Sequence, residues 1–250
     1  MDKEFFILGD EFRGVGGYPQ HQTMRCDDNG NYYDYKAPNS VHQIRSDRFL
    51  DVAPNFNSIQ LSRKIKLTDK ISSAPILWYV MLVSNRLLNL LKLFNLPPHR
   101  IYPVPVLHGK KAIAGYSALH ILIPEEFIQE VIFEQSKFWI REGVMGCNKV
   151  EQLQINSGAD LKEAHSRLQQ LGWQLRVQAE YFSIRREFLE KMDLFAIPGT
   201  AFPNRFYVSS ELRSAIEKEK ITGLRFIQRQ DWEEGFAASL PRWPCVLNLP

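Results

Sequence analysis

The clearest pattern of hydrophobic and polar positions lies near the end of the chain. Apolar side chains recur at helical spacing over residues 209–220. Ser209 or Ser210 precedes them as an N-cap, a hydroxyl that accepts hydrogen bonds from backbone N–H groups of the first turn. Gly223 can end the helix in a left-handed turn, and residues 224–228 resume with the alternation of a strand. The pattern predicts a helix, a turn and a strand.

Strand-like residues dominate the middle of the chain. The runs 100–111 and 112–124 are apolar, β-branched or aromatic in alternation, and His108, Gly109 and Lys110 form a turn between them, so we predict a β-hairpin. Further predicted elements are strands at 4–8, 127–142, 150–155 and 193–197, and a helix at 160–173.

One apolar segment, residues 75–98, predicts a long amphipathic helix near 75–95. Pro75 suits a first helical turn, and Pro97 with Pro98 ends the segment. The apolar run is interrupted by polar side chains three to four residues apart, at Asn85, Arg86, Asn89 and Lys92. Because this polar face carries few basic residues, we expect a buried helix rather than one that binds a membrane surface.

Together these elements predict an α+β fold, mainly antiparallel sheet with several helices. The 250 residues suffice to close a substantial hydrophobic core. No internal repeat or linker divides the sequence, so we expect a single domain over residues 1–250, and a less regular N-terminal subdomain over residues 1–60 is the alternative.

Composition and charge narrow the function classes only slightly. The formal net charge is +3, and basic residues alternate with acidic ones along the sequence, which does not favour nucleic-acid binding. The three cysteines, Cys26, Cys147 and Cys245, are too far apart for a disulfide framework or a metal site. The first residues lack the basic and long apolar regions of a signal peptide. We therefore expect a cytoplasmic protein with no nucleic-acid or membrane partner.

No motif predicts catalytic chemistry. The glycines of residues 14–17 lack the spacing of a phosphate-binding loop, and the six histidines lack the spacing of a zinc site. Ser117 has Leu119 where a nucleophile elbow requires glycine. The acidic pairs 27–28 and 125–126 lie in turn-like contexts. We expect no catalytic residue, no cofactor and no metal, hence a protein that is not an enzyme.

The order of segments over residues 45–230 resembles a family of bacterial immunity proteins associated with polymorphic toxins. The segments are VAPNFNSIQLSRK, RIYPVPVL, GYSALHIL, EQSKFW, EKMDLFAI and RFYVSSELRSAIEKEKITGLRF. The last is the strongest match, through Ser209, Ser210, Glu211, Ile216, Ile221, Gly223, Leu224 and Phe226. Residues 137–160 depart from the family pattern, and residues 1–45 do not align with it. We interpret the matching residues as determinants of the fold: caps, a turn glycine and core aromatics.

The resemblance implies an immunity protein that neutralises a secreted bacterial toxin, of the contact-dependent or type VI kind, by direct binding in the cytoplasm. Because immunity proteins for basic nucleases are often acidic and this chain is slightly basic, a neutral or acidic toxin is favoured. Candidate toxin-binding anchors are the aromatic residues Tyr32, Tyr33, Tyr35, Trp232, Phe236 and Trp243. The alternatives are an enzyme whose site is assembled from distant residues and a regulatory binding module without a toxin. The oligomeric state stays open.

Overall fold

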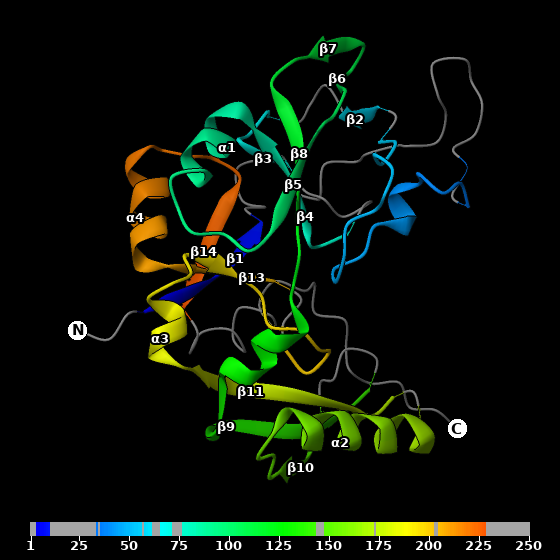
Figure 1. Ribbon diagram of the computed structural model, residues 1–250, viewed down its shortest axis with the longest axis vertical. Coiled ribbons are helices and arrows are strands. Elements are labelled where there is room, and N and C mark those ends of the chain that lie inside the picture. Colours follow the sequence, from blue (N-terminus) through cyan, green and yellow to red (C-terminus); the bar gives the residue numbers. More distant parts are fainter. Residues whose placement is uncertain are drawn as a thin grey trace.

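The computed structural model describes residues 4–10, 34, 36–56, 58–61, 66–71, 77–143, 148–172, 174–202 and 205–228. Within them the protein has a mixed α+β fold whose strands form four sheets, and all pairings except that of β2 with β6 are antiparallel (Figure 1). The α+β prediction with mainly antiparallel sheet is therefore confirmed.

The central sheet joins the start of the chain to its later part. Its strand order is β12 (Leu194–Phe195), β13 (Phe206–Ser209), β1 (Phe5–Asp10) and β14 (Leu224–Gln228). Along β1, Phe6 and Leu8 enter one hydrophobic core, whereas Ile7 enters another on the opposite face. The sheet is thus buried on both sides, as expected when successive side chains of a strand point to opposite faces.

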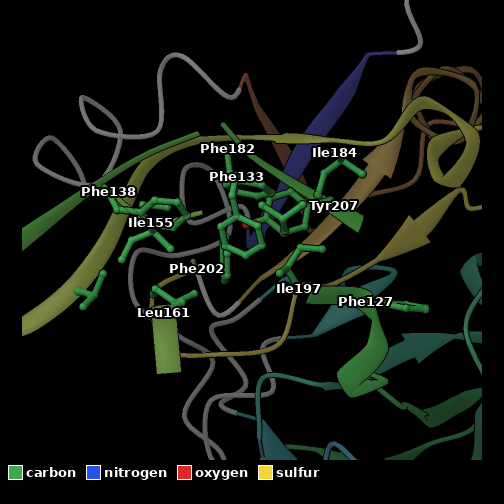
Figure 2. Packing of buried hydrophobic residues seen from close by; sticks show 14 of the residues in the cluster. Phe127, Phe133, Phe138, Ile155, Leu161, Phe182, Ile184, Ile197, Phe202 and Tyr207 are labelled. Carbon is green, nitrogen blue, oxygen red and sulfur yellow. The ribbon is translucent and has the colours of Figure 1, made fainter. Parts of the chain in front are cut away.

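A second sheet covers one face of the central sheet. Its order is β10 (Asn148–Leu153), β9 (Val131–Glu142) and β11 (Arg176–Ile184), and the helical elements nearby are η2 (Glu125–Glu130), α2 (Gly158–Leu171) and α3 (Arg186–Leu189). The core between them is rich in aromatic rings (Figure 2). Phe138 and Tyr207 are fully buried there, and Phe182 meets Tyr207 edge to face with 5.4 Å between ring centroids.

The other face of the central sheet packs against the elements at the opposite end of the molecule (Figure 1). One sheet there has the order β3 (Lys70–Ile71), β4 (Val80–Ser84), β8 (Tyr116–Ile121) and β5 (His99–Pro103); a smaller one has the order β2 (Ile59–Leu61), β6 (Val106–His108) and β7 (Lys111–Ile113). The helical elements are η1 (Val41–Gln43), α1 (Asn85–Leu91) and α4 (Ser210–Lys218).

The prediction of a long helix near 75–95 is wrong. Residues 80–84 form β4, and the helix α1 has only 7 residues. Because β4 is covered on both faces, with Met81 and Val83 in one core and Val80 and Leu82 in another, its sequence is a continuous apolar run without strand alternation. Ser84 begins α1, since its Oγ accepts a hydrogen bond from the N–H of Leu87 at 3.2 Å.

The predicted elements near the C-terminus are confirmed. Ser209 is the N-cap of α4, where its Oγ accepts a hydrogen bond from the N–H of Leu212 at 3.1 Å. Gly223 has a φ of 88°, and a Cβ at this position would lie 2.3 Å from the backbone oxygen of Lys70. Ser209 and Gly223 therefore act as determinants of the fold. The predicted turn at residues 108–110 also connects β6 to β7, and the predicted helix over 160–173 corresponds to α2.

Candidate functional site

The outer face of the β10-β9-β11 sheet presents an aromatic side chain away from the core. Along β9, Phe138 and Ile140 are buried in the core, so the alternating residues Lys137, Trp139 and Arg141 lie on the opposite face. All three are partly exposed. A tryptophan on an open sheet face distinguishes this strand from the aromatic residues that fill the core behind it.

The neighbouring strands extend this face through their register with β9. On β10, Lys149 is opposite Arg141 and Gln152 is opposite Trp139. On β11, Arg176 is opposite Arg141 and Gln178 is opposite Trp139. Directly opposed side chains share a face of the sheet. We call this surface the Trp139 face, and its residues are Lys137, Trp139, Arg141, Lys149, Gln152, Arg176, Gln178 and Glu180.

Glu180 organises the centre of the Trp139 face. The register of β11 with β9 shifts between Ala179 and Tyr181, and Glu180 lies at this shift. Its Oε2 accepts a hydrogen bond from Nε1 of Trp139 at 2.7 Å and lies 3.0 Å from Nζ of Lys137, while its Oε1 accepts one from Nζ of Lys149 at 2.6 Å. One carboxylate therefore fixes the indole and both ammonium groups. A shift in register is a common way for a strand to re-aim a side chain.

The surroundings of Glu180 keep it ionised. Burial alone would raise its pKa, but the hydrogen bonds from Lys149, Trp139 and Lys137 outweigh burial and lower the pKa to about 2. The ammonium groups of Lys137 and Lys149 also lie over the Trp139 ring, 5.3 and 5.4 Å from its centroid, within the range of a cation–π interaction. The indole is thus held in one orientation before any partner arrives.

The Trp139 face is basic. Lys137, Arg141, Lys149 and Arg176 are its four cationic residues, and Glu180 is its one carboxylate. Lys137 and Arg141 are neighbours on one face of β9, and the strand register brings Lys149 and Arg176 onto the same surface. Because four cationic side chains share this surface with one carboxylate, and the formal net charge of the whole chain is +3, the surface has a positive potential.

The polar clusters elsewhere in the described structure hold elements together. Asp69 accepts hydrogen bonds from Oγ of Ser84 at 2.8 Å and from the backbone N–H of Thr222 at 2.9 Å, which connects β3 and β4 to the turn before β14. Asp193 accepts from Oγ of Ser209 at 2.8 Å and from the backbone N–H of Asn95 at 3.0 Å. These carboxylates bind backbone and hydroxyl groups of the fold, so we assign them structural roles.

His120 is the one fully buried histidine among the described residues. Its Nε2 lies 2.7 Å from the backbone oxygen of Arg45, and its ring meets that of Phe49 edge to face. Burial lowers its pKa, more than the hydrogen bond with Arg45 raises it. A neutral His120 therefore fastens the segment around residues 45–49 onto β8.

The six predicted toxin-binding residues, Tyr32, Tyr33, Tyr35, Trp232, Phe236 and Trp243, lie outside the described residues. The same is true of Cys26, Cys147 and Cys245, residues 14–17 and the acidic pair 27–28. Ser117 lies within β8, and His108 ends β6.

The described residues contain no group of three or more histidine, cysteine, aspartate or glutamate side chains placed to hold a metal ion. Among the helices of the described ranges, none has the length and apolar character needed to cross a membrane.

Comparison with known proteins adds no relative: no protein-family model matches the chain, and no curated protein matches it. The function must therefore be argued from the surface itself.

Sequence reasoning missed the Trp139 face, although one signal was present. Residues 137–141 read Lys-Phe-Trp-Ile-Arg, in which the second and fourth positions suit a core and the others suit a solvated face. The contributions of β10 and β11 depend on the register and have no comparable local signal.

Proposed function

We propose that this protein is an immunity protein, which binds a cognate bacterial toxin in the cytoplasm and neutralises it by direct contact without catalysing a reaction. The observation that carries the proposal is the Trp139 face, where a tryptophan is fixed among basic side chains on a sheet. Tryptophan and arginine are the residues that most often dominate the binding energy of protein interfaces.

The rigidity of the Trp139 face supports a binding role. A side chain that is already ordered loses less conformational entropy on association, so more of its contact energy contributes to affinity. The hydrogen bond to Glu180 and the two cation–π contacts supply this order for Trp139. The face is also built on strands, which position side chains more accurately than loops do.

The resemblance to immunity proteins supports the proposal in a second way. Its strongest part, residues 209–226, consists of residues that cap, turn and pack the fold, so it bears on architecture more than on specificity. Within residues 137–160, which depart from the family pattern after the matching segment EQSKFW, Arg141, Lys149 and Gln152 belong to the Trp139 face. A surface that selects one partner is expected to differ among proteins with a shared fold.

The test is co-expression with the product of the open reading frame immediately upstream, under tight control in a bacterial host. We expect that product to be toxic alone, and we expect this protein to restore growth and to co-purify with it. A harmless neighbour, or toxicity without rescue and without co-purification, would contradict the proposal. A screen for enzymatic activity on small-molecule substrates would then address the main alternative.

A further inference from the structure

We propose that the Trp139 face is the docking site for the toxin and that it accepts an acidic protein surface, with Trp139 as the central anchor. This inference rests on the proposed function for the identity of the partner. It adds where the partner binds and what chemistry it presents.

Charge complementarity is the first reason. Four cationic residues share the face with one carboxylate, Glu180, so the surface attracts an acidic partner and repels a basic one. Glu180 does not offer a negative charge for contact, because its two oxygens already accept from Trp139 and Lys149 and lie close to Lys137. An ammonium group has three N–H donors, so Lys137 can bond a partner carboxylate and keep its contact with Glu180.

The apolar surface beside the cations is the second reason. Tyr181 on β11 is 42% exposed and lies opposite Lys137 of β9, so it shares the face of the sheet that carries Trp139. Interfaces combine an aromatic and apolar centre with a polar, charged rim. The three-stranded sheet provides both within one surface.

A second exposed sheet surface within the described ranges lacks this combination. On the small β2-β6-β7 sheet, Ile59, Leu61 and Val106 face the core, which leaves Gln60 and its register partner Leu107 on the outside. These side chains bring no charge and no aromatic ring. The Trp139 face is therefore the better candidate of the two.

The geometry around Trp139 favours a protein over a single-stranded nucleic acid. Nucleic-acid platforms offer open aromatic faces on which bases stack. Two ammonium groups lie over the Trp139 ring, where a stacked base would have to displace them. A carboxylate instead approaches the ammonium groups themselves.

The experiment measures the affinity of purified protein for the upstream gene product at about 50 mM and about 300 mM NaCl. The variants are Trp139→Ala and the double variant Lys137→Gln/Lys149→Gln. The matched control is Lys110→Gln/Lys111→Gln on the β6–β7 hairpin, which removes the same two charges from exposed positions outside the face. Circular dichroism and thermal melting check that each variant is folded.

We expect Trp139→Ala to weaken binding by about 30-fold or more, as for a central interface tryptophan. The affinity of the Lys137/Lys149 variant should be about tenfold lower at low salt and should depend less on salt, while the affinity of the Lys110/Lys111 control should stay within about twofold of the wild type. If the wild type rescues growth and binds, but folded Trp139→Ala and the Lys137/Lys149 variant bind equally well, the docking site is wrong and the proposed function stands. If the wild type neither rescues nor binds, both fail.

A second arm uses a single-stranded DNA oligonucleotide as the probe. Tight binding that is lost in Trp139→Ala would overturn the assignment of a protein partner. Weak binding that is insensitive to Trp139→Ala agrees with it.

Discussion

Replacing Gly223 by alanine should destabilise the protein strongly, because two separate penalties act at this position. At its φ of 88° an L-residue costs about 1–2 kcal/mol. The new Cβ would also lie 2.3 Å from the backbone oxygen of Lys70 and 2.8 Å from Oγ1 of Thr68, so the turn and β3 must separate. Both contacts are closer than any real Cβ tolerates, and the oxygen of Lys70 belongs to backbone that cannot swing aside.

Moving the turn at Gly223 away from β3 weakens the hydrogen bonds that connect the two. The N–H of Lys70 donates to the backbone oxygen of Thr222 at 3.0 Å, and the N–H of Thr222 donates to the Asp69 carboxylate at 2.9 Å. A hydrogen bond between neutral groups contributes about 1 kcal/mol to stability, and a hydrogen bond to a charged group contributes about 1.5–3 kcal/mol. With the backbone penalty, we expect Gly223→Ala to lower the free energy of unfolding by about 3–5 kcal/mol.

Gly115→Ala is the matched control. Gly115 has the same φ of 88°, but its added Cβ would meet only Asn85, at an ordinary 3.5 Å. We expect the free energy of unfolding of this variant to fall by about 1–2 kcal/mol. Urea unfolding monitored by circular dichroism measures both, with the midpoint falling and the slope unchanged. Equal losses in the two variants would refute the reasoning, since the close contact would then have no energetic effect.

Three further outcomes are expected. Folding lowers the pKa of Glu180 from 4.5 to about 2, so its contribution to stability is complete above about pH 5 and is lost as the pH falls towards about 2. Across this pH range, the urea midpoint should therefore fall less in Glu180→Gln than in the wild type. Parallel curves of midpoint against pH would contradict this. Burial lowers the pKa of His120 from 6.5, so the wild type should lose stability as the pH falls below about 6.5. A similar loss in a folded His120→Gln variant would exclude His120 as its source. Ser84→Ala removes the N-cap of α1 and the hydrogen bond from Ser84 to Asp69, and it should cost about 1–2 kcal/mol in urea unfolding. The exposed Ser214→Ala should change stability by less than about 0.5 kcal/mol. Equal effects would argue against a stabilising role of the Ser84 hydroxyl.

The fold was predictable where local signals agree with the tertiary environment. The cap at Ser209, the apolar stripe of α4 and the turn at Gly223 each follow from short-range chemistry, and the structure contains all three. The run 80–83 was not predictable in this way. Its periodicity fits a buried helix as well as a strand covered on both faces, and pairing with β8 decides between them.

The candidate site was less accessible from sequence than the fold. Lys137 and Trp139 are two residues apart, but Lys149 and Glu180 reach them through pairing with other strands and through the register shift at Glu180. A shift of one residue would turn such side chains to the opposite face. Apart from the alternation of residues 137–141, the clustering of charge on this surface is therefore a property of register.

The position of β1 between β13 and β14 has a consequence for how the protein is made. The strand at residues 5–10 leaves the ribosome well before the strands that flank it, which end at Ser209 and Gln228. At about 5–20 residues per second, the ribosome needs about 10–45 seconds to supply them. During that interval both edges of β1 lack their final partners, so the central sheet forms only after β14 has been synthesised. Until then Phe6, Ile7 and Leu8 lack the complete sheet around which their two cores pack.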